Sequence, residues 1–484
     1  MLTKPYRHQA EGLAWALRKP SGGLFWEPGV GKTWGALAIA EARRARLMIV
    51  PPARLIPNWL KEIGKHTTRE PRAYLGNKRG RALDGDTVLI SQEMFRVVFD
   101  PRRKAKRADE DKVRRLGGVK TTEETIEARR AQDEIAESFN RWIAAGQSML
   151  VVDESHRLKD AQSAQSRALG MVAPRFTYRL IMTGTPVAHD LFDLWAQFRV
   201  VGREVFGFDA ETSFRRYVAQ AFRVAYKPQP EWRMKPGMDK WILGRAALFS
   251  HVRHTSDCYD LPPRSYETIE CEMLPEQAKL YRRMEAVGMA IVDDETVSAS
   301  TKLAELMKLR QIAGGVLDHK EDGEQTRHAV PSGKLEALKD VLKDYHGHHV
   351  AVWTSGDSVS ETLRVAAEIK AGRIDGSVPI GDRLAMKDRW EAGPASPLVL
   401  SARAISEGVD IVGPHVAIYY SSPWSYIDRE QSERRLWRPG QKGSVKIIDL
   451  VLRGTVDEDV RDALTTKQAV LDVVMGKRRA ACGS

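Results

Sequence analysis

A glycine-containing stretch near the N-terminus constrains the fold of this chain more than any other feature. Residues 26–33 read WEPGVGKT. They lie between apolar residues 24–26, which predict the end of a strand, and residues 34–40, which predict a helix. A turn between a strand and a helix leaves backbone N–H groups unpaired, and such groups bind phosphate oxygens. We expect Lys32 to reach the β- and γ-phosphates of a nucleotide and Thr33 to coordinate Mg²⁺ through its hydroxyl.

The expected nucleotide contacts extend beyond the lysine and the threonine. A glutamine about twenty residues before such a loop can hydrogen-bond an adenine edge, and Tyr6 or Arg7 could stack on the ring. The usual loop pattern has a glycine where this chain has Trp26, so a tight glycine turn with a solvated lysine is the alternative for this stretch alone. The residues that we expect to contact ATP here are Tyr6, Arg7, Gln9, Pro28, Gly29, Val30, Gly31, Lys32, Thr33 and Trp34.

Paired acids follow another apolar run. Residues 148–152 read SMLVV and predict a buried strand, which is followed at once by Asp153 and Glu154. Ligands of open α/β sheets bind at the carboxyl ends of the strands. We expect Asp153 to hold Mg²⁺, directly or through water, and Glu154 to orient and deprotonate the attacking water. Together with the loop, this pair predicts an ATP hydrolase.

Composition excludes several other classes of protein. The net charge is +12 with a pI near 9.5, which favours a polyanionic partner. The three cysteines, Cys258, Cys271 and Cys482, form no CxxC pair, so neither a disulfide framework nor a zinc cluster is indicated. The N-terminus lacks the apolar core of a secretion signal, and no run of about 18 apolar residues occurs. We therefore expect a cytoplasmic protein that does not enter a membrane.

Two segments between the motifs have a distinctive composition. Residues 96–147 are rich in arginine and lysine and then in glutamate, alanine and arginine, which predicts a basic, largely helical insertion or a mobile loop on the surface. A solvated surface is the favoured interpretation of this charge, and contact with DNA phosphates is the alternative. Residues from about 190 to 250 are rich in aromatic residues and read as helical, with most of the apolar stripe in the core.

Taken in order, these stretches resemble the first-lobe motifs of superfamily-two helicases, and in particular the SWI/SNF-type DNA-dependent ATPases. The resemblance covers nearly the whole chain and suggests a minimal form, of bacterial or phage origin. The absence of the first loop glycine is a feature of the helicase-type variant. The stretches that carry the resemblance are Gln9 and residues 29–33, 50–59, 153–156 (DESH), 180–186 (LIMTGTP), 260–264 and 309–312.

The second half resembles the second lobe of the same family. Residues 349–353 predict the first strand of a second sheet, and residues 398–401 predict another. Residues 402–410 then resemble the fifth motif, which implies nucleotide contacts from Gly408 and Asp410. Residues 431–441 (QSERRLWRPGQ) resemble the sixth motif. Its arginines, Arg435 and Arg438, lie three apart, so we expect them on one helix face, aimed at the γ-phosphate.

The resemblance implies an α/β fold with two RecA-like parallel-sheet lobes, helical protrusions and a C-terminal brace helix. The expected boundaries are 1–200 for the first lobe, with the basic insertion at about 96–147, 201–258 for its helical protrusion, 259–330 for the linker and the protrusion of the second lobe, 331–455 for the second lobe, and 456–484 for the brace helix and tail.

The implied function is an ATP-dependent translocase or remodeller that tracks the backbone of double-stranded DNA. The implied catalytic residues are Lys32, Asp153, Glu154, Arg435 and Arg438. Mg²⁺ would be bound by Thr33 and Asp153. We expect a monomer. Single strands are the alternative nucleic-acid partner, and the sequence does not identify a protein partner. A helicase that separates or anneals strands uses the same motor and stays an alternative. A catalytically inactive nucleic-acid-binding scaffold is disfavoured by the intact catalytic residues.

Overall fold

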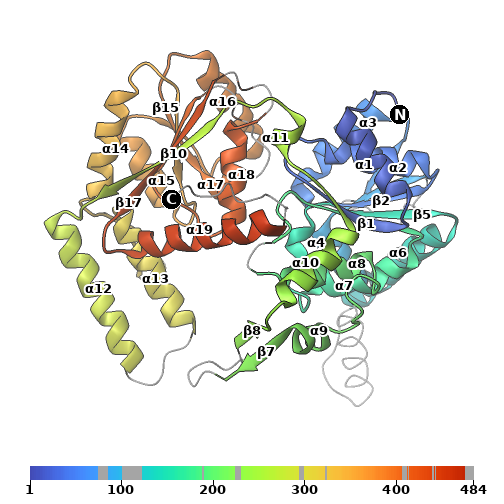
Figure 1. The fold of residues 1–484 in the computed structure, drawn as a ribbon. Coiled ribbons are helices and arrows are strands. Elements are labelled where there is room, and N and C mark those ends of the chain that lie inside the picture. The colour runs from blue at the N-terminus through green and yellow to red at the C-terminus, as the bar shows by residue number, and fades with distance from the viewer. Residues whose placement is uncertain are drawn as a thin grey trace. The chain divides into compact units, whose positions relative to one another are not determined.

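The chain divides into two compact units (Figure 1). The first consists of Met1–Cys258 and Val470–Ser484, and the second of Tyr259–Ala469. The structure is a computed structural model, and the residues that it describes are 1–74, 85–100, 123–187, 190–223, 231–293, 299–321, 324–405, 411, 414–438, 441 and 443–474.

A seven-stranded sheet forms the centre of the first unit, and each pair of neighbouring strands is parallel. In spatial order the strands are β3 (Pro71–Tyr74), β4 (Thr87–Ile90), β2 (Arg46–Val50), β5 (Ser148–Val152), β6 (Tyr178–Met182), β1 (Ser21–Trp26) and β9 (Ser250–Arg253). The apolar runs of β1, β2, β4 and β5 are almost wholly buried, as strands covered on both faces require. The strands predicted in 24–26 and 148–152 are confirmed.

Helices cover both faces of this sheet. Figure 1 shows α1 (Arg7–Leu17), α2 (Lys32–Ala42) and α3 (Ile56–His66) on one side. On the other side it shows α4 (Gln92–Phe99), α6 (Glu123–Ala144), α7 (Ala164–Val172) and α8 (Asp193–Val201). Most residues of α2 are buried, because this helix packs against the sheet with α1 and α3 as its neighbours. The basic part of the predicted insertion, residues 101–122, lies outside the described residues.

The region from 190 to 250 differs from the helical expectation. It contains α9 (Glu211–Val218), a hairpin of β7 (Ala219–Phe222) and β8 (Glu231–Met234), and α10 (Met238–Leu248). Directly after it, β9 joins the main sheet and α11 (Thr255–Cys258) follows. The helical prediction is therefore wrong for the hairpin and misses β9. These strands have only four residues each and little apolar alternation, so packing and backbone pairing decide their structure.

The second unit is built on a six-stranded parallel sheet. Its strands in spatial order are β10 (Arg264–Cys271), β17 (Val445–Leu452), β16 (Val416–Tyr419), β13 (Val350–Thr354), β15 (Pro397–Ser401) and β14 (Gly372–Ile374). Along β13, Val350 and Val352 join one apolar cluster, while Ala351 and Trp353 join another. The sheet is therefore buried on both faces. The strands predicted at 349–353 and 398–401 are confirmed.

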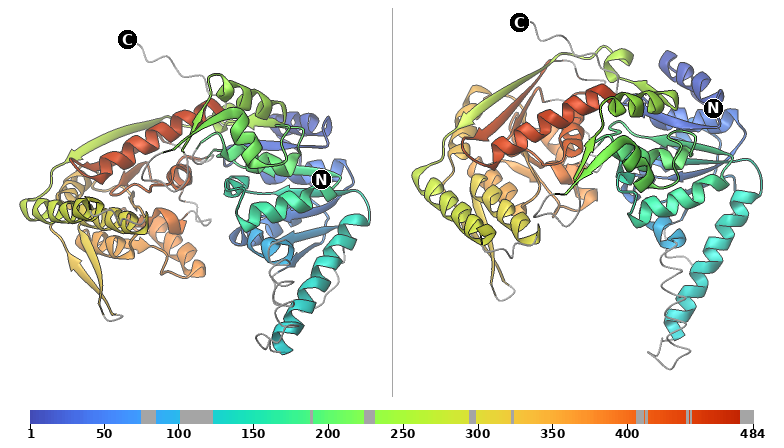
Figure 2. Two further views of the ribbon diagram at one scale, coloured as in Figure 1. Left: turned by 90° about the horizontal axis from the view of Figure 1, so that it is seen from below. Right: turned by 60° about the horizontal axis from the view of Figure 1, so that its bottom comes forward.

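Helices and one hairpin complete the second unit. The helices are α12 (Pro275–Asp293), α13 (Ala299–Ala313), α14 (Gly333–Asp344), α15 (Val359–Glu368), α16 (Ile380–Ala392), α17 (Ala402–Ile405), α18 (Tyr426–Leu436) and α19 (Val456–Val474). The last residues of α19, from Val470 on, belong to the first unit. Figure 2 shows the antiparallel hairpin of β11 (Val316–Glu321) and β12 (Glu324–Ala329) projecting from the unit. The predicted fold class, two parallel-sheet α/β lobes with helical additions, is confirmed. Among the described residues, no helix is long and apolar enough to span a bilayer.

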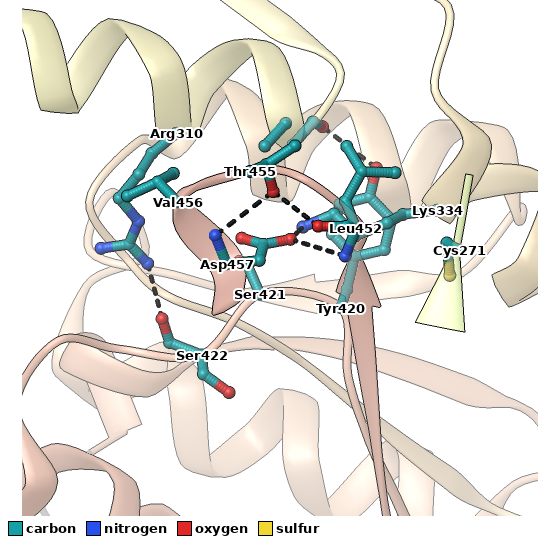
Figure 3. Close-up of polar contacts among 12 residues, drawn as sticks. Cys271, Arg310, Lys334, Tyr420, Ser421, Ser422, Leu452, Thr455, Val456 and Asp457 are labelled. Carbon is teal, nitrogen blue, oxygen red and sulfur yellow. Dashed lines mark hydrogen bonds and ion pairs between the residues drawn. The ribbon is translucent and has the colours of Figure 1, made fainter. Parts of the chain in front are cut away.

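A buried ion pair fixes the start of α19 (Figure 3). The side chain of Lys334 is 1% exposed, and its Nζ lies 2.7 Å from Oδ2 of Asp457. The same carboxylate oxygen accepts a hydrogen bond from the backbone N–H of Leu452. Thr455 Oγ1 accepts the backbone N–H of Asp457 and donates to the Leu452 carbonyl. These contacts join the ends of β17, α14 and α19 within the second unit.

Candidate active site

The turn between β1 and α2 has the backbone geometry of a phosphate-binding loop. Gly29 and Gly31 have φ angles of 84° and 88°, which lie in the left-handed region that glycine adopts without a steric penalty. Helix α2 begins directly afterwards, at Lys32. The predicted strand, turn and helix are thus confirmed, and the backbone N–H groups at the start of α2 are available to an anion.

Residues of α1 lie against this loop. His8 is buried, and its Nε2 lies 3.0 Å from the carbonyl oxygen of Val30. Gln9 is also buried, and its Oε1 accepts the backbone N–H of Tyr6 at 2.9 Å. A Cβ atom on Gly31 would lie only 2.2 Å from Nε2 of Gln9, so a side chain at position 31 would displace the glutamine. The glutamine predicted to read adenine is thus placed at the loop.

The other two N-terminal candidates lie farther out on the surface. Tyr6 is 62% exposed and its ring stacks on His8, with the ring centroids 5.8 Å apart. The side chain of Arg7 is 95% exposed and forms an ion pair with Glu11. Tyr6 therefore presents a ring face next to the loop, whereas Arg7 contacts its own helix.

Trp26, which replaces the usual first glycine, is a core residue of the first unit. Its ring is completely buried, and a Cβ on Gly12 would lie 2.2 Å from Cζ2 of that ring. Its Nε1 donates a hydrogen bond to Nδ1 of His251 on β9 at 2.9 Å. Its backbone carbonyl accepts a hydrogen bond from Lys32 Nζ at 2.8 Å. The indole thus fastens the loop to α1 and β9, which explains the departure from the glycine pattern.

Thr255, which follows β9, is hydrogen-bonded to two residues of the loop. Glu27 is buried, and its Oε2 accepts the backbone N–H of Thr255 at 2.9 Å. The Thr255 hydroxyl donates to the carbonyl of Pro28 at 3.1 Å. These bonds join residues that are 228 and 227 positions apart in the sequence. They were not predicted, because nothing local to residue 255 marks it as a partner of the loop.

The paired acids stand at the carboxyl end of β5, as predicted. Oδ2 of Asp153 accepts a hydrogen bond from Nε1 of Trp59 at 2.9 Å. Burial raises the pKa of Asp153 to about 6, and the neighbouring Glu154 carboxylate raises it too, while Lys32 and the Trp59 hydrogen bond act in the opposite direction. Trp59 was not predicted as a site residue either, since it lies on α3, where it reads as an ordinary apolar position.

Glu154 has an unusual backbone and a strongly acidic side chain. Its φ of 49° and ψ of 50° are left-handed, a conformation that is uncommon for residues other than glycine and clusters at functional sites. Burial on its own would raise its pKa, but the hydrogen bond and charge of His156, together with the charges of Lys32 and Arg54, outweigh burial and lower the pKa to about 2. Glu154 is therefore ionised at neutral pH.

His156 connects the acids to the hydroxyl-rich segment after β6. Its Nδ1 lies 3.2 Å from Oε2 of Glu154 and 2.9 Å from Oγ1 of Thr183. The same threonine hydroxyl accepts the backbone N–H of Thr185 at 3.1 Å. A Cβ on Gly184 would lie 2.7 Å from Cδ of Pro28, so this segment also contacts the phosphate-binding loop. Loop, acids and hydroxyls thus form one connected site.

The residues of this site suit ATP with Mg²⁺. The left-handed glycines keep side chains out of the loop, and Lys32 is close enough to influence the pKa of both acids. Thr33 and Asp153 offer the oxygen ligands that Mg²⁺ prefers. Among the described residues, no group of three or more His, Cys, Asp or Glu side chains could hold a metal by itself.

The arginines of the sixth motif belong to the second unit. Helix α18 ends at Leu436, so Arg435 lies in its last turn and Arg438 lies beyond the helix. The expectation that both share one helix face is therefore wrong. The cause is in the sequence, because Pro439 disfavours helical backbone at the residue before it. The other second-half candidates, Gly408 and Asp410, lie outside the described residues.

Buried ion pairs hold α18 in place beside these arginines. Arg429 is 8% exposed, donates to Oδ2 of Asp449 at 2.9 Å and pairs with Glu433 at 2.7 Å. Arg434 is similarly buried and pairs with Glu430 one turn earlier. Buried ion pairs within α18, and one to Asp449 of β17, thus hold this charged helix in place. Arg435 is half-buried in its last turn.

Comparisons with known proteins agree with this geometry. Residues 8–317 match the family profile described as SNF2-related domain, and residues 333–440 match the helicase conserved C-terminal domain. A DNA repair and recombination protein RAD54-like from Gallus gallus is 24% identical, over 94% of this chain and 64% of that protein. The ISWI chromatin-remodeling complex ATPase ISW1 from Saccharomyces cerevisiae is 24% identical, over 98% of this chain and 41% of that protein.

The chain spans less than two thirds of the length of these relatives. A solved structure titled Sulfolobus solfataricus SWI2/SNF2 ATPase core in complex with dsDNA aligns with 99% of this chain and 96% of its own, at 18% identity and a TM-score of 0.40.

Proposed function

Because this chain belongs to the family of SNF2-related domain proteins, we propose that it hydrolyses ATP in response to duplex DNA and uses the energy to move along the DNA backbone. The observation that carries the proposal is the connected site of the first unit. It combines a glycine loop with Lys32 and an ionised Glu154 that is hydrogen-bonded to His156.

Each side chain of the site has a distinct task in this proposal. The loop N–H groups and Lys32 bind the phosphates, while Thr33 and Asp153 hold Mg²⁺, which neutralises charge on them. Glu154 accepts a proton from the attacking water, and His156 keeps its carboxylate oriented. Thr183 is hydrogen-bonded to His156, so the hydroxyl segment responds when the nucleotide moves the acids. Arg435 and Arg438 stabilise the charge that develops on the γ-phosphate.

Duplex DNA is the proposed partner. The net charge of +12 favours a polyanion, and the printed names of the relatives refer to DNA repair, recombination and chromatin remodelling. The second unit also contains a cavity of about 300 Å³ beyond the ends of β13, β14 and β15, whose lining includes Arg383, Ser401 and Arg403. Arginine and hydroxyl groups at the carboxyl edge of a parallel sheet suit backbone phosphates, which are the same in every sequence.

A phosphate-release assay tests the proposal. Rates are compared with duplex DNA, single strands, RNA and no nucleic acid, for the wild type and for Lys32→Ala. We expect duplex DNA to raise the rate of the wild type most, and the variant to stay inactive in every case. An equal rate with and without nucleic acid would reject the DNA dependence. Unwinding of a forked duplex would favour the strand-separating helicase, and binding without any hydrolysis would favour the scaffold.

A further inference from the structure

We propose that the β7–β8 hairpin and the end of α9, both in the first unit, form an additional contact for duplex DNA. Arg216 of α9, Arg223 directly after β7 and Arg233 of β8 make this contact to backbone phosphates. The inference rests on the proposed function, since it assigns a second surface to the same partner. It concerns a part of the chain that the sequence motifs do not reach. Figure 1 shows β7 and β8 at the end of α9 and beside α10, away from the main sheet of the unit.

The surroundings of the hairpin are strongly basic. Residues 211–240 contain seven lysines and arginines against three acids, Glu211, Glu231 and Asp239. Arg216, Arg223 and Arg233 are all exposed. Within the described part of the chain, none of the three forms an ion pair with a carboxylate, whereas Arg215 of the same helix pairs with Glu211 at 2.7 Å. Exposed arginines without carboxylate partners leave their charge available to an anion.

The register places part of this charge on one face of the ribbon. Gln220 pairs with Arg233, and Phe222 pairs with Glu231, so these four side chains share a face. The guanidinium of Arg233 lies over the Phe222 ring, 4.7 Å from its centroid. Stacking of this kind holds the guanidinium plane while its N–H groups stay in solvent. The opposite face carries Ala219, Ala221, Trp232 and Met234.

Hydrogen bonds join the base of the hairpin to α9, and α9 packs into an aromatic cluster. Lys235 Nζ donates to the carbonyls of Arg216 and Tyr217 at 2.7 and 2.9 Å, and such carbonyls at the C-terminal end of a helix lack partners within the helix. Phe214 of α9 is completely buried among Phe192, Phe206 and Phe208. Lys235 therefore stabilises the end of α9, so we do not include it among the proposed phosphate contacts.

A two-stranded ribbon such as β7–β8 is an element that the major groove of DNA can accommodate. A two-stranded β-ribbon is narrow enough to enter the major groove of B-DNA, where cations along its sides reach phosphates of the flanking strands. Three such arginine–phosphate pairs add a binding term that is independent of sequence and steeply dependent on salt. This suits a protein that must hold the duplex at any position.

The test compares three variants of the full chain with the wild type. The first, R216Q/R223Q/R233Q, removes three charges from the hairpin and the end of α9, and the second, R216K/R223K/R233K, keeps them. The matched control, R18Q/R44Q/K61Q, removes three exposed charges of the same unit from α3 and from the ends of α1 and α2, where the described residues show no ion pair for them. Affinity for a blunt mixed-sequence duplex is measured by fluorescence anisotropy at several salt concentrations, together with DNA-stimulated phosphate release.

For the glutamine variant we expect DNA binding at least about tenfold weaker at roughly 0.1 M salt. The salt slope should fall by roughly one unit for each phosphate that the variant no longer neutralises. Its rate at saturating DNA should equal that of the wild type, because the ATP site is untouched. The lysine variant and the control should bind DNA like the wild type.

Two results would overturn the inference: an unchanged affinity and slope in the glutamine variant, or an equal loss of affinity in the control. The proposed function fails separately, if the wild type binds DNA but its phosphate release does not respond to it. In that case the affinity series still decides whether the hairpin contacts DNA.

Discussion

Glu154 is the residue on which hydrolysis should depend most directly. Its carboxylate is ionised, with a pKa lowered to about 2, and is held by His156 at 3.2 Å. Glu154→Gln keeps the size and hydrogen-bonding capacity of the side chain but cannot accept a proton. We expect ATP binding close to that of the wild type, and a DNA-stimulated turnover number lower by about 10²-fold or more.

Equilibrium binding of a fluorescent ATP analogue and steady-state phosphate release measure the two quantities. Glu62→Gln, a partly exposed glutamate on α3, is the matched control and should change neither. Near-normal turnover of Glu154→Gln would remove this residue from the role of base.

For single residues, the sequence locates the candidate catalytic groups better than the groups that support them. Lys32, Thr33, Asp153 and Glu154 stand in contiguous motifs, whose spacing follows from a single strand and the turn after it. The supporting residues His8, Trp59, Glu27 and Thr255 reach the site only through tertiary packing. Their types are compatible with ordinary core or cap positions, so no local pattern separates them from such positions.

The hydrogen bond between Trp26 of β1 and His251 of β9 should make the stability of the first unit depend on pH. Burial lowers the pKa of His251 to about 4, and Arg253 lowers it further while Glu11 opposes this. Because an indole N–H can only donate, Nδ1 of His251 accepts from Trp26 and must be unprotonated. In the unfolded chain the imidazole has a pKa of about 6.5. Between these values the unfolded state binds more protons, so stability falls as the pH falls.

We therefore expect the thermal unfolding midpoint of the wild type to decrease between about pH 6.5 and pH 4 more steeply than that of His251→Gln. The glutamine oxygen can still accept from Trp26, but the side chain does not titrate. Differential scanning fluorimetry of both proteins across this range gives the comparison. Parallel curves would show that protonation of His251 does not change the stability of the first unit.

The ion pair of Lys334 and Asp457 supports the second unit. Lys334→Met would leave the Asp457 carboxylate, which is 10% exposed, without its cation. Breaking a buried pair from one side costs about 3–5 kcal/mol, whereas replacing both partners by apolar groups costs much less. Urea denaturation should show a large loss of stability for Lys334→Met and a partial recovery for K334M/D457L.

Lys343→Met is the matched control for this ion pair. It removes an exposed lysine from the same helix, where its pair with Asp340 is in solvent, and should have little effect on the free energy of unfolding. An equal loss in both lysine variants would contradict the assignment.

At the element scale, long buried strands are predictable and short surface elements are not. The apolar runs of β2, β5 and β13 are unambiguous, because strands buried on both faces need no polar alternation. The four residues of β9 and of each hairpin strand carry no such signal. Pro439 alone predicts that α18 ends before Arg438. The spacing of Arg435 and Arg438 led instead to the prediction of a continuous helix.

For the whole molecule, the sequence predicts both lobes because each is an independent series of strands and helices with its own motifs. The structure confirms two parallel sheets, one in each unit. The phosphate-binding loop and the acids lie in the first unit, and Arg435 and Arg438 lie in the second. The proposed hydrolysis therefore requires residues of both units.

The most direct test of this two-unit mechanism measures nucleotide affinity and DNA-stimulated turnover for Arg438→Ala, with Arg389→Ala, an exposed arginine of α16, as the control. We predict near-normal ATP and DNA binding, because the first unit is unchanged. We also predict turnover lower by about 10³-fold or more, since an arginine that stabilises the transition state is removed. The control should keep full activity. Unchanged turnover of Arg438→Ala, or an affinity for ATP that falls as steeply as the rate, would contradict the mechanism.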